Sequence, residues 1–178
     1  MQQILKNPLK NISKPKLAVI FVAVGLLLAY IFALPRNLFD VSYSTVVVDR
    51  NGELLGARIA DDEQWRFPPT GNVPERFKIS LLQFEDQHFY RHFGVNPLSI
   101  VRAARQNIQE RRIVSGASTI TMQVIRLSRN RNRTFGEKII EAILATRLEF
   151  RYSKDEILAL YAAHAPFGGN VVGLEAAA

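Results

Sequence analysis

The segment FEDQHFYRHFG, residues 84 to 94, is the part of this sequence that is densest in chemistry. It holds two adjacent carboxylates, two imidazoles, four aromatic rings and a turn glycine. Phe84 and Phe89 flank Glu85, and we expect their rings to desolvate its carboxylate, which would make that carboxylate a stronger general base. Glu85 is therefore the first catalytic candidate. The alternative is that Glu85 and Asp86 form a solvated helix end whose neighbouring rings lie in the core.

The composition is that of a folded protein with a basic appendage. The chain has 178 residues, of which 48% are hydrophobic, and this suits one domain plus an appendage. The absence of cysteine excludes a disulfide framework and a thiolate metal site. The net charge is +7, and residues 1–16 contribute four lysines to it and no acid.

Residues 17–34 form an uncharged apolar run that Pro35 and Arg36 close. These eighteen residues would span about 27 Å as a helix, close to the thickness of the hydrocarbon core of a bilayer. The preceding lysines are expected to hold the N-terminus in the cytoplasm. We therefore predict a cytoplasmic basic tail over 1–16, a transmembrane anchor over 17–35 and an exported remainder. A cleaved signal peptide is the alternative.

Residues 36–74 are predicted to form a β-hairpin and a connector. The run TVVV at 45–48 is β-branched, and Asn51-Gly52 supplies a tight turn. Residues 65–69, WRFPP, are typical of a proline-stiffened connector. Asn72 can then cap a helix that runs to about Phe84 and places Glu85 at its end.

Two further helix starts follow. Asn96-Pro97 predicts a helix whose apolar face includes Leu98, Val101 and Ile108. In the segment GASTITMQ, residues 116–123, small hydroxyl side chains after a glycine predict a helix N-terminus with free backbone N–H groups, which suits an anion. An ordinary Ser or Thr cap is the alternative for this segment.

Arginine dominates the region from Arg102 to Arg133. This region contains eight arginines, no lysine and a single acid, Glu110. The planar guanidinium matches phosphate oxygens at two points, so the region indicates a phosphate-bearing ligand or an anionic membrane surface. Nucleic acid is not predicted, because an exported chain rarely meets it and no zinc finger or aromatic RNA-binding motif is present. A solvated basic face is the alternative for many of these arginines.

The strongest helix pattern covers residues 135–151. Its apolar side chains occupy most of the circumference, which predicts a central buried helix. Lys138, Glu141 and Glu149 share one narrow polar stripe on it, which either lines a polar cleft or carries a Lys138–Glu141 pair on a solvated edge. Two spacings predict capping boxes, Thr134 with Glu137 at the start of this helix and Ser153 with Glu156 at the start of the next one, which runs to about Ala163.

Four motifs stand in order in this sequence. They are Glu85-Asp86-x-x-Phe89-x-x-His92-x-Gly94, Gly116-x-Ser118-Thr119-Ile120-Thr121-x-Gln123, Lys138-x-x-Glu141 and Lys154-x-x-Ile157-Leu158-x-x-Tyr161. In this order they resemble the glycosyltransferase domain of the class A penicillin-binding proteins and the monofunctional peptidoglycan glycosyltransferases. The resemblance covers about residues 44–178, and the segments 62–68 and 164–170 look most like the 1C type.

The resemblance implies a mainly α, lysozyme-like glycosyltransferase domain over 75–178, with the short β-hairpin before it and one transmembrane helix. It implies that the domain polymerises lipid II into glycan strands, with release of undecaprenyl diphosphate, on the periplasmic side of the bacterial inner membrane. Glu85 would deprotonate the acceptor sugar, and Glu141 would assist catalysis. The substrate-binding residues that the resemblance implies are Asp86, His92, Ser118, Thr119, Gln123 and Lys138.

The same resemblance implies the cofactors and partners. Mg²⁺ or Mn²⁺ would assist, with Glu141 as its candidate ligand, and no organic cofactor is expected. The partners would be lipid II, the growing glycan strand, inner-membrane lipids and other cell-wall synthesis proteins. A diphosphate leaving group needs little protonation, so one basic carboxylate and several cations suffice, whereas a glycosidase needs a second carboxylate. His88 and His92 have the spacing of zinc ligands, but zinc is not predicted without a third ligand.

Some positions depart from the family pattern. Glu137 stands where the family usually has arginine, and we expect its charge to repel a diphosphate. Ala159 replaces a glutamate, and Ala162-Ala163 replaces Leu-Asn. The sequence stops within the fifth motif, so we expect a C-terminally incomplete domain. The alternative function is therefore a catalytically inactive, membrane-anchored fragment that at most binds lipid II or a partner protein.

Overall fold

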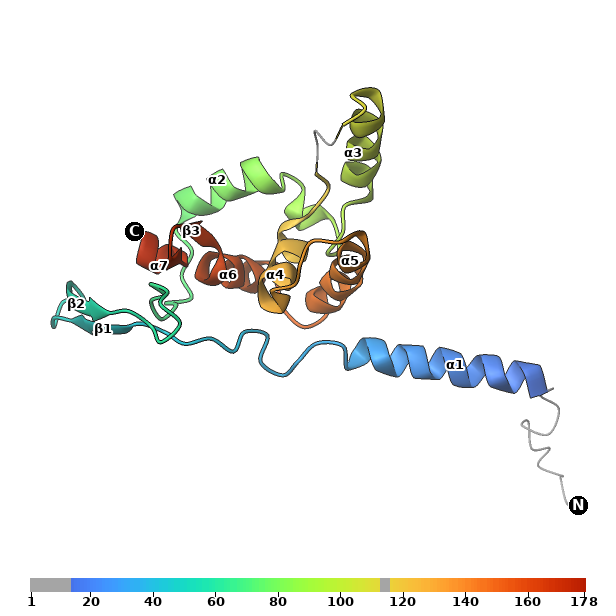
Figure 1. The fold of residues 1–178 in the computed structure, drawn as a ribbon, viewed down its shortest axis with the longest axis horizontal. Helices are drawn as coiled ribbons and strands as arrows, with labels where there is room; N and C mark the ends of the chain where they lie inside the picture. The colour runs from blue at the N-terminus through green and yellow to red at the C-terminus, as the bar shows by residue number, and fades with distance from the viewer. Residues whose placement is uncertain (1–13, 113–115) are drawn as a thin grey trace, which may run out of the picture. The chain divides into compact units, whose positions relative to one another are not determined.

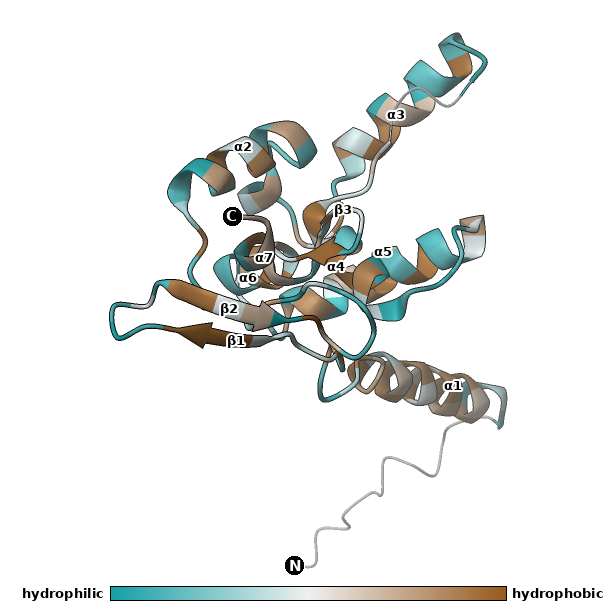
Figure 2. Cartoon of the chain, turned by 60° about the vertical axis from the view of Figure 1, so that its left-hand side comes forward, coloured by the Kyte–Doolittle hydropathy of each residue, from teal (hydrophilic) through white to brown (hydrophobic). Residues whose placement is uncertain are grey.

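The computed structural model describes residues 14–112 and 116–178, and the chain divides between Pro35 and Arg36 into two units. The described part of the first unit is helix α1 (Lys14–Ile31). None of its residues is buried, and it is long and apolar enough to cross a membrane. Figure 2 shows it hydrophobic along most of its length. The helix covers residues 17–31 of the predicted anchor and begins three residues before it, whereas residues 32–35 are not helical. Most of the predicted basic tail lies outside the described residues.

The second unit, residues 36–178, begins with the predicted hairpin (Figure 1). Strand β1 (Thr45–Val48) pairs antiparallel with β2 (Leu54–Arg58), and a register shift falls between Val47 and Val48. The Asp49 carboxylate accepts hydrogen bonds from the backbone N–H groups of Asn51 and Glu53, at 2.7 and 2.8 Å. Gly52 adopts a φ of +88°, which glycine tolerates without strain. The hairpin and its turn are confirmed.

A second small hairpin joins the connector to the end of the chain. Strand β3 (Pro166–Gly168) pairs antiparallel with β4 (Val171–Val172). The Trp65 N–H donates to the Asn170 carbonyl at 2.8 Å, and the Val172 N–H donates to the Trp65 carbonyl at 2.9 Å. The connector and the segment after α6 (Lys154–His164) are therefore neighbours in the fold, although about a hundred residues separate them.

Helices make up the rest of the unit. They are α2 (Glu75–Glu85), the 3₁₀ helix η2 (Phe89–Arg91), α3 (Pro97–Gln109), α4 (Ile120–Arg129), α5 (Phe135–Glu149), α6 (Lys154–His164) and α7 (Leu174–Ala177). Asn96 caps α3 as predicted, and its side chain accepts from the Ser99 N–H. The predicted Asn72 cap is wrong, because Pro74 occupies the N-cap of α2 and no side chain caps that end.

The capping box of Ser153 with Glu156 is complete, since each side chain accepts from the other residue's backbone. The predicted box of Thr134 with Glu137 is only half made. The Thr134 hydroxyl accepts from the Glu137 N–H at 3.1 Å, but the Glu137 carboxylate turns to the Arg129 guanidinium instead. The side chain that a capping box requires is thus engaged in an ion pair.

The centre of the core is α4, which packs against both α5 and α6. Every residue from Ile120 to Ile125 is buried. Helix α5, which was predicted to be central, buries only one face, made of Glu141, Leu144, Ala145 and Leu148. Its other face is exposed, with Phe135 at 81% and Ile143 at 50%. The prediction is wrong because apolar side chains around a circumference give burial only where other elements cover each side.

Candidate active site

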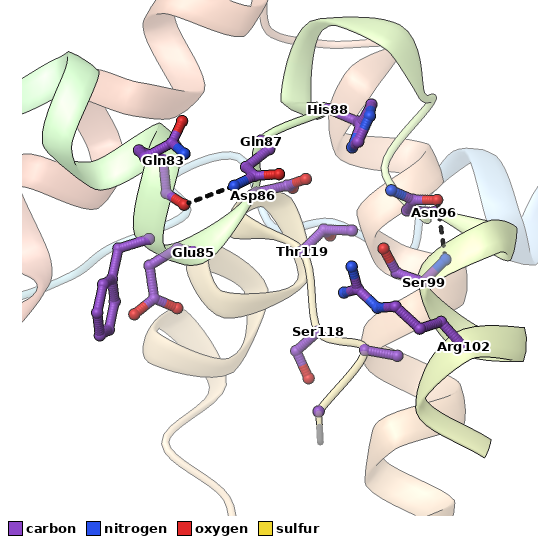
Figure 3. A pocket seen from close by; sticks show the side chains of 13 residues that line it. Gln83, Glu85, Asp86, Gln87, His88, Asn96, Ser99, Arg102, Ser118 and Thr119 are labelled. Atoms are coloured by element: carbon purple, nitrogen blue, oxygen red, sulfur yellow. Dashed lines mark hydrogen bonds between the residues drawn. The ribbon is translucent and has the colours of Figure 1, made fainter. Parts of the chain in front are cut away.

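Glu85 is the last residue of α2 and lies at the edge of a pocket of about 170 Å³ (Figure 3). Figure 3 shows Glu85 on one side, Ser118 from the segment before α4 beside it, and the Arg102 guanidinium of α3 directed toward the same space. His88 and Ser99 also line this pocket. The lining is mostly polar, which suits a ligand with many hydroxyl or phosphate oxygens.

The Glu85 carboxylate is exposed and is held from one side by an amide. Gln123 Nε2 donates to Glu85 Oε2 at 2.7 Å, and Gln123 itself is 9% exposed. The predicted desolvation by two rings is wrong. Phe84 is 90% exposed and Phe89 is fully buried in the core, so neither ring covers the carboxylate. Consecutive side chains at the end of α2 point to different sides of the helix. The sequence alone did not reveal these directions.

Asp86 points inward where Glu85 points outward. It is 8% exposed, and its carboxylate lies 2.9 and 3.1 Å from His92 Nε2. The same carboxylate accepts from the backbone N–H of Ile120 at 3.2 Å. The N-terminus of α4, predicted to suit an anion, is thus occupied by a carboxylate of the chain itself. Asp86 and His92, predicted as substrate-binding residues, join the first motif to the second.

Thr119 is a buried cap rather than a free ligand. Its hydroxyl donates to the Gly94 carbonyl at 2.6 Å and accepts from the Met122 N–H at 3.2 Å, so the ordinary cap interpretation holds for this residue. Gly94 adopts a φ of +76°, and a Cβ there would stand 2.6 Å from the Ala145 carbonyl carbon. Only glycine allows the first motif to approach the backbone of α5 so closely.

A buried polar network that we did not predict supports this arrangement. Lys154 Nζ donates to the His92 carbonyl at 2.8 Å and to Glu149 Oε1 at 2.7 Å, and it lies 4.3 Å from the centre of the Phe89 ring. Glu149 also accepts from the Thr121 hydroxyl at 2.7 Å. Lys154 of the fourth motif therefore fixes the position of the first motif through His92 and Phe89. Lys154 stood in the sequence as a motif residue, but nothing in the sequence indicated these partners.

Arg126 links the two catalytic candidates. Its guanidinium donates to Gln123 Oε1 at 3.3 Å, and the amide of Gln123 binds Glu85. Burial raises the pKa of the Glu141 carboxyl, and the nearby charges of Arg126 and Arg133 oppose that rise. Burial also raises the pKa of the Tyr161 hydroxyl, and the charge of Glu85 adds to it. Arg126 and Tyr161 thus belong to the site. From sequence, Arg126 was only one of eight arginines and Tyr161 only a motif residue.

The departures at the third motif have a specific geometry. Arg129 forms a two-point ion pair with Glu137, with its closest contact at 2.9 Å between Nη2 and Oε2. The Glu137 carboxylate is therefore neutralised by Arg129, and this weakens the predicted repulsion of a diphosphate. Lys138 is exposed on α5 and does not line the pocket beside Glu85. Its charge nevertheless opposes the rise in the pKa of Glu141 that burial causes.

The described residues, 14–112 and 116–178, contain no group of three His, Cys, Asp or Glu side chains that could hold a metal ion. His92 faces Asp86, while His88 lies in the polar pocket. Glu141 is a single buried carboxylate with cations around it. Such a donor set fits a Mg²⁺ ion only if the diphosphate of a ligand supplies further oxygens.

The chain is similar to known proteins over most of its length. Residues 51–178 match the family described as transglycosylase. The chain is 46% identical over 145 residues to penicillin-binding protein 1C of Escherichia coli, which covers 80% of this chain and 19% of that protein. It is 36% identical over 145 residues to penicillin-binding protein 4 of Bacillus subtilis, covering 80% of this chain and 23% of that protein. It is 36% identical over 169 residues to penicillin-binding protein 1A of Aquifex aeolicus, covering 90% and 23%. The chain therefore spans about a fifth of the length of these relatives.

Proposed function

This chain belongs to the transglycosylase family, and we propose that it is a peptidoglycan glycosyltransferase that polymerises lipid II and releases undecaprenyl diphosphate. The observation that supports this most strongly is the position of Glu85. An ionisable carboxylate stands at the mouth of a polar pocket, fixed by the Gln123 amide, and the Arg126 guanidinium lies behind that amide. A base, its positioning donor and a cation are thus contiguous.

In this proposal Glu85 accepts the proton of the acceptor sugar's 4-hydroxyl. The freed oxygen attacks the anomeric carbon of the donor and forms the new C–O bond with inversion. The bond from that carbon to the diphosphate oxygen breaks, and the diphosphate keeps the electron pair. Because the leaving group is a stable anion, no second carboxylic acid is needed across the bond.

The cations around Glu141 would hold the diphosphate. The charges of Arg126, Arg133 and Lys138 all act on Glu141, so all three lie near that carboxylate. Guanidinium groups bind phosphate oxygens at two points, which suits Arg126 and Arg133. We propose that Mg²⁺ or Mn²⁺, when present, is held by Glu141 and the substrate's diphosphate and neutralises part of its charge.

Contact with the membrane is part of the same proposal, because the substrate carries a lipid tail. On α3, Leu98 is 80% exposed, Val101 67% and Ile108 76%. Arg105, Arg111 and Arg112 are exposed on or just after the same helix. An exposed apolar stripe beside arginines suits the surface of an anionic bilayer. With α1 as the anchor, we propose that the N-terminus is cytoplasmic and that the unit 36–178 is periplasmic.

Two assays separate this function from the alternatives. The 178-residue chain in detergent is given fluorescent lipid II, and polymer formation is followed by gel electrophoresis. In a parallel reaction it is given finished peptidoglycan. Polymer from the first reaction supports the proposal. Muropeptides from the second without polymer would indicate a hydrolase, and lipid II binding without either product would indicate an inactive binding module.

A further inference from the structure

The helix that carries Glu85 has little packing of its own. Within α2, all of which lies in the described part of the chain, Leu81 is the single buried residue. The helix ends at Glu85, and the Asp86 N–H donates to the Leu82 carbonyl. Asp86 fixes only this end, through His92 and Ile120. Gln123 binds the Glu85 carboxylate at the same end. The direction of the rest of α2 depends on contacts elsewhere along the helix.

Those contacts come from the N-terminal part of the helix, at Phe77 and Lys78. The Phe77 ring lies 6.0 Å from the Phe167 ring of β3. Lys78 Nζ donates to Asp155 Oδ1 at 3.0 Å, and Asp155 lies in the first turn of α6. Helix α6 is a core element with Ile157 and Leu158 fully buried, so it provides a rigid reference for α2.

Asp155 also binds the segment after Glu85. The Tyr90 hydroxyl of η2 donates to the same oxygen, Asp155 Oδ1, at 2.6 Å. Lys78 Nζ lies 5.2 Å from the centre of the Tyr90 ring. The hydrogen bonds from Tyr90 and Lys78 lower the pKa of Asp155, which keeps it ionised near neutral pH. One carboxylate therefore binds a residue that precedes Glu85 and a residue that follows it.

We propose that Asp155 is a positioning residue, which sets the location of Glu85 by holding Lys78 of α2 and Tyr90 of η2 on α6. This inference rests on the proposed role of Glu85 as the base. The Asp155 side chain is 74% exposed, so its loss removes little from the stability of the core. Its effect falls on geometry, because a misplacement of about 1 Å can slow a reaction by about 100-fold.

The kinetic test uses Lys78→Met and Asp155→Ala, which removes the oxygen that accepts both hydrogen bonds. Glu75→Gln is the control, since Glu75 is an exposed carboxylate in the first turn of the same helix. Both test variants should lower kcat about 10- to 100-fold with KM for lipid II nearly unchanged and the thermal midpoint retained. The control should match the wild type. The double exchange Lys78→Asp with Asp155→Lys should recover part of kcat, which a role of Asp155 in substrate binding would not produce.

The positional test does not need activity. The chain has no cysteine, so spin labels can be placed at Ile79→Cys on α2 and Ile143→Cys on α5, both at exposed positions. Asp155→Ala should shift or broaden the distance between the labels, and Glu75→Gln should not. If the wild type forms no polymer, the proposed function fails while the label distances still test the positioning. Unchanged distances in Asp155→Ala, or changed distances with an unchanged kcat, would overturn the inference.

Discussion

Gln123 Nε2 donates a 2.7 Å hydrogen bond to Glu85 Oε2, and this bond joins the middle of the buried helix α4 to the exposed end of α2. The amide can orient the carboxylate without supplying a proton to the reaction. The Gln123 carbonyl oxygen in turn accepts from Arg126. Base and cation are therefore coupled through one side chain.

Gln123→Glu should change the pH dependence of the reaction. Two carboxylates at hydrogen-bond distance share a proton, so the acidic limb of the pH–rate profile should move to higher pH by about one unit or more. Gln123→Met, which keeps the size but loses the donor, should lower kcat about 10-fold. Gln106→Glu on the exposed side of α3 is the matched control. A profile identical to the wild type would mean that Gln123 does not contact the base during turnover.

Glu141→Gln should stabilise the protein at neutral pH. Burial raises the pKa of Glu141 above its ordinary value of 4.5, so the folded state holds this proton more tightly than the unfolded state. The free energy of unfolding contributed by this group therefore falls as pH rises from about 4.5 through the raised folded value, and stays low above it. Glu141→Gln removes this loss of stability, because the glutamine side chain does not ionise. Thermal melts between pH 4 and 8 should show a smaller slope and a higher Tm at pH 7, while Glu110→Gln should leave both unchanged.

Glu137→Gln should free Arg129 and strengthen anion binding. The two-point ion pair between them is partly exposed, and such pairs contribute about 1 kcal/mol or less. Calorimetry with inorganic diphosphate at low salt should show binding tightened by a few fold. A double-mutant cycle with Arg129→Gln should give a coupling of similar size. Weaker binding by Glu137→Gln would show that this carboxylate takes part in the ligand site.

The exposed stripe of α3 should bind membranes without α1. Residues 37–178 should associate with vesicles that contain anionic lipid, and the association should fall as salt rises. Leu98→Gln with Ile108→Gln should reduce binding at every salt concentration, whereas Arg105→Gln with Arg112→Gln should reduce its salt dependence. Absence of binding by the unsubstituted unit would show that the arginines serve only the ligand.

The sequence was sufficient where local chemistry decides the structure. The caps at Asn96 and Ser153 are formed as predicted, and Thr119 makes the ordinary cap that was the alternative for its segment. Each cap depends on neighbours a few residues away. The hairpin turn at Asn51-Gly52 has the same origin. The motifs also named Glu85 and Gln123, whose side chains are hydrogen-bonded to each other.

The sequence was not sufficient where distant segments meet. The contacts of Lys154 with His92 and of Lys78 with Asp155 join residues far apart in the chain. The type of one residue does not indicate which distant residue it will contact. The predicted environment of Glu85 was wrong for a related reason, since adjacent residues on a helix end face different directions. The central role of α4 over α5 depends on which helices cover which faces, and apolar content alone does not determine this.

The most direct measurement is the rate of lipid II polymerisation by the wild-type chain, Glu85→Gln and Glu85→Asp, with lipid II binding and thermal melts measured on the same samples. The amide keeps the shape of the side chain but cannot accept a proton, so Glu85→Gln should lose about 100-fold or more of the rate while binding and Tm are kept. Glu85→Asp should lose less. A Glu85→Gln variant that polymerises lipid II at a rate close to that of the wild type would contradict the assignment of Glu85 as the base.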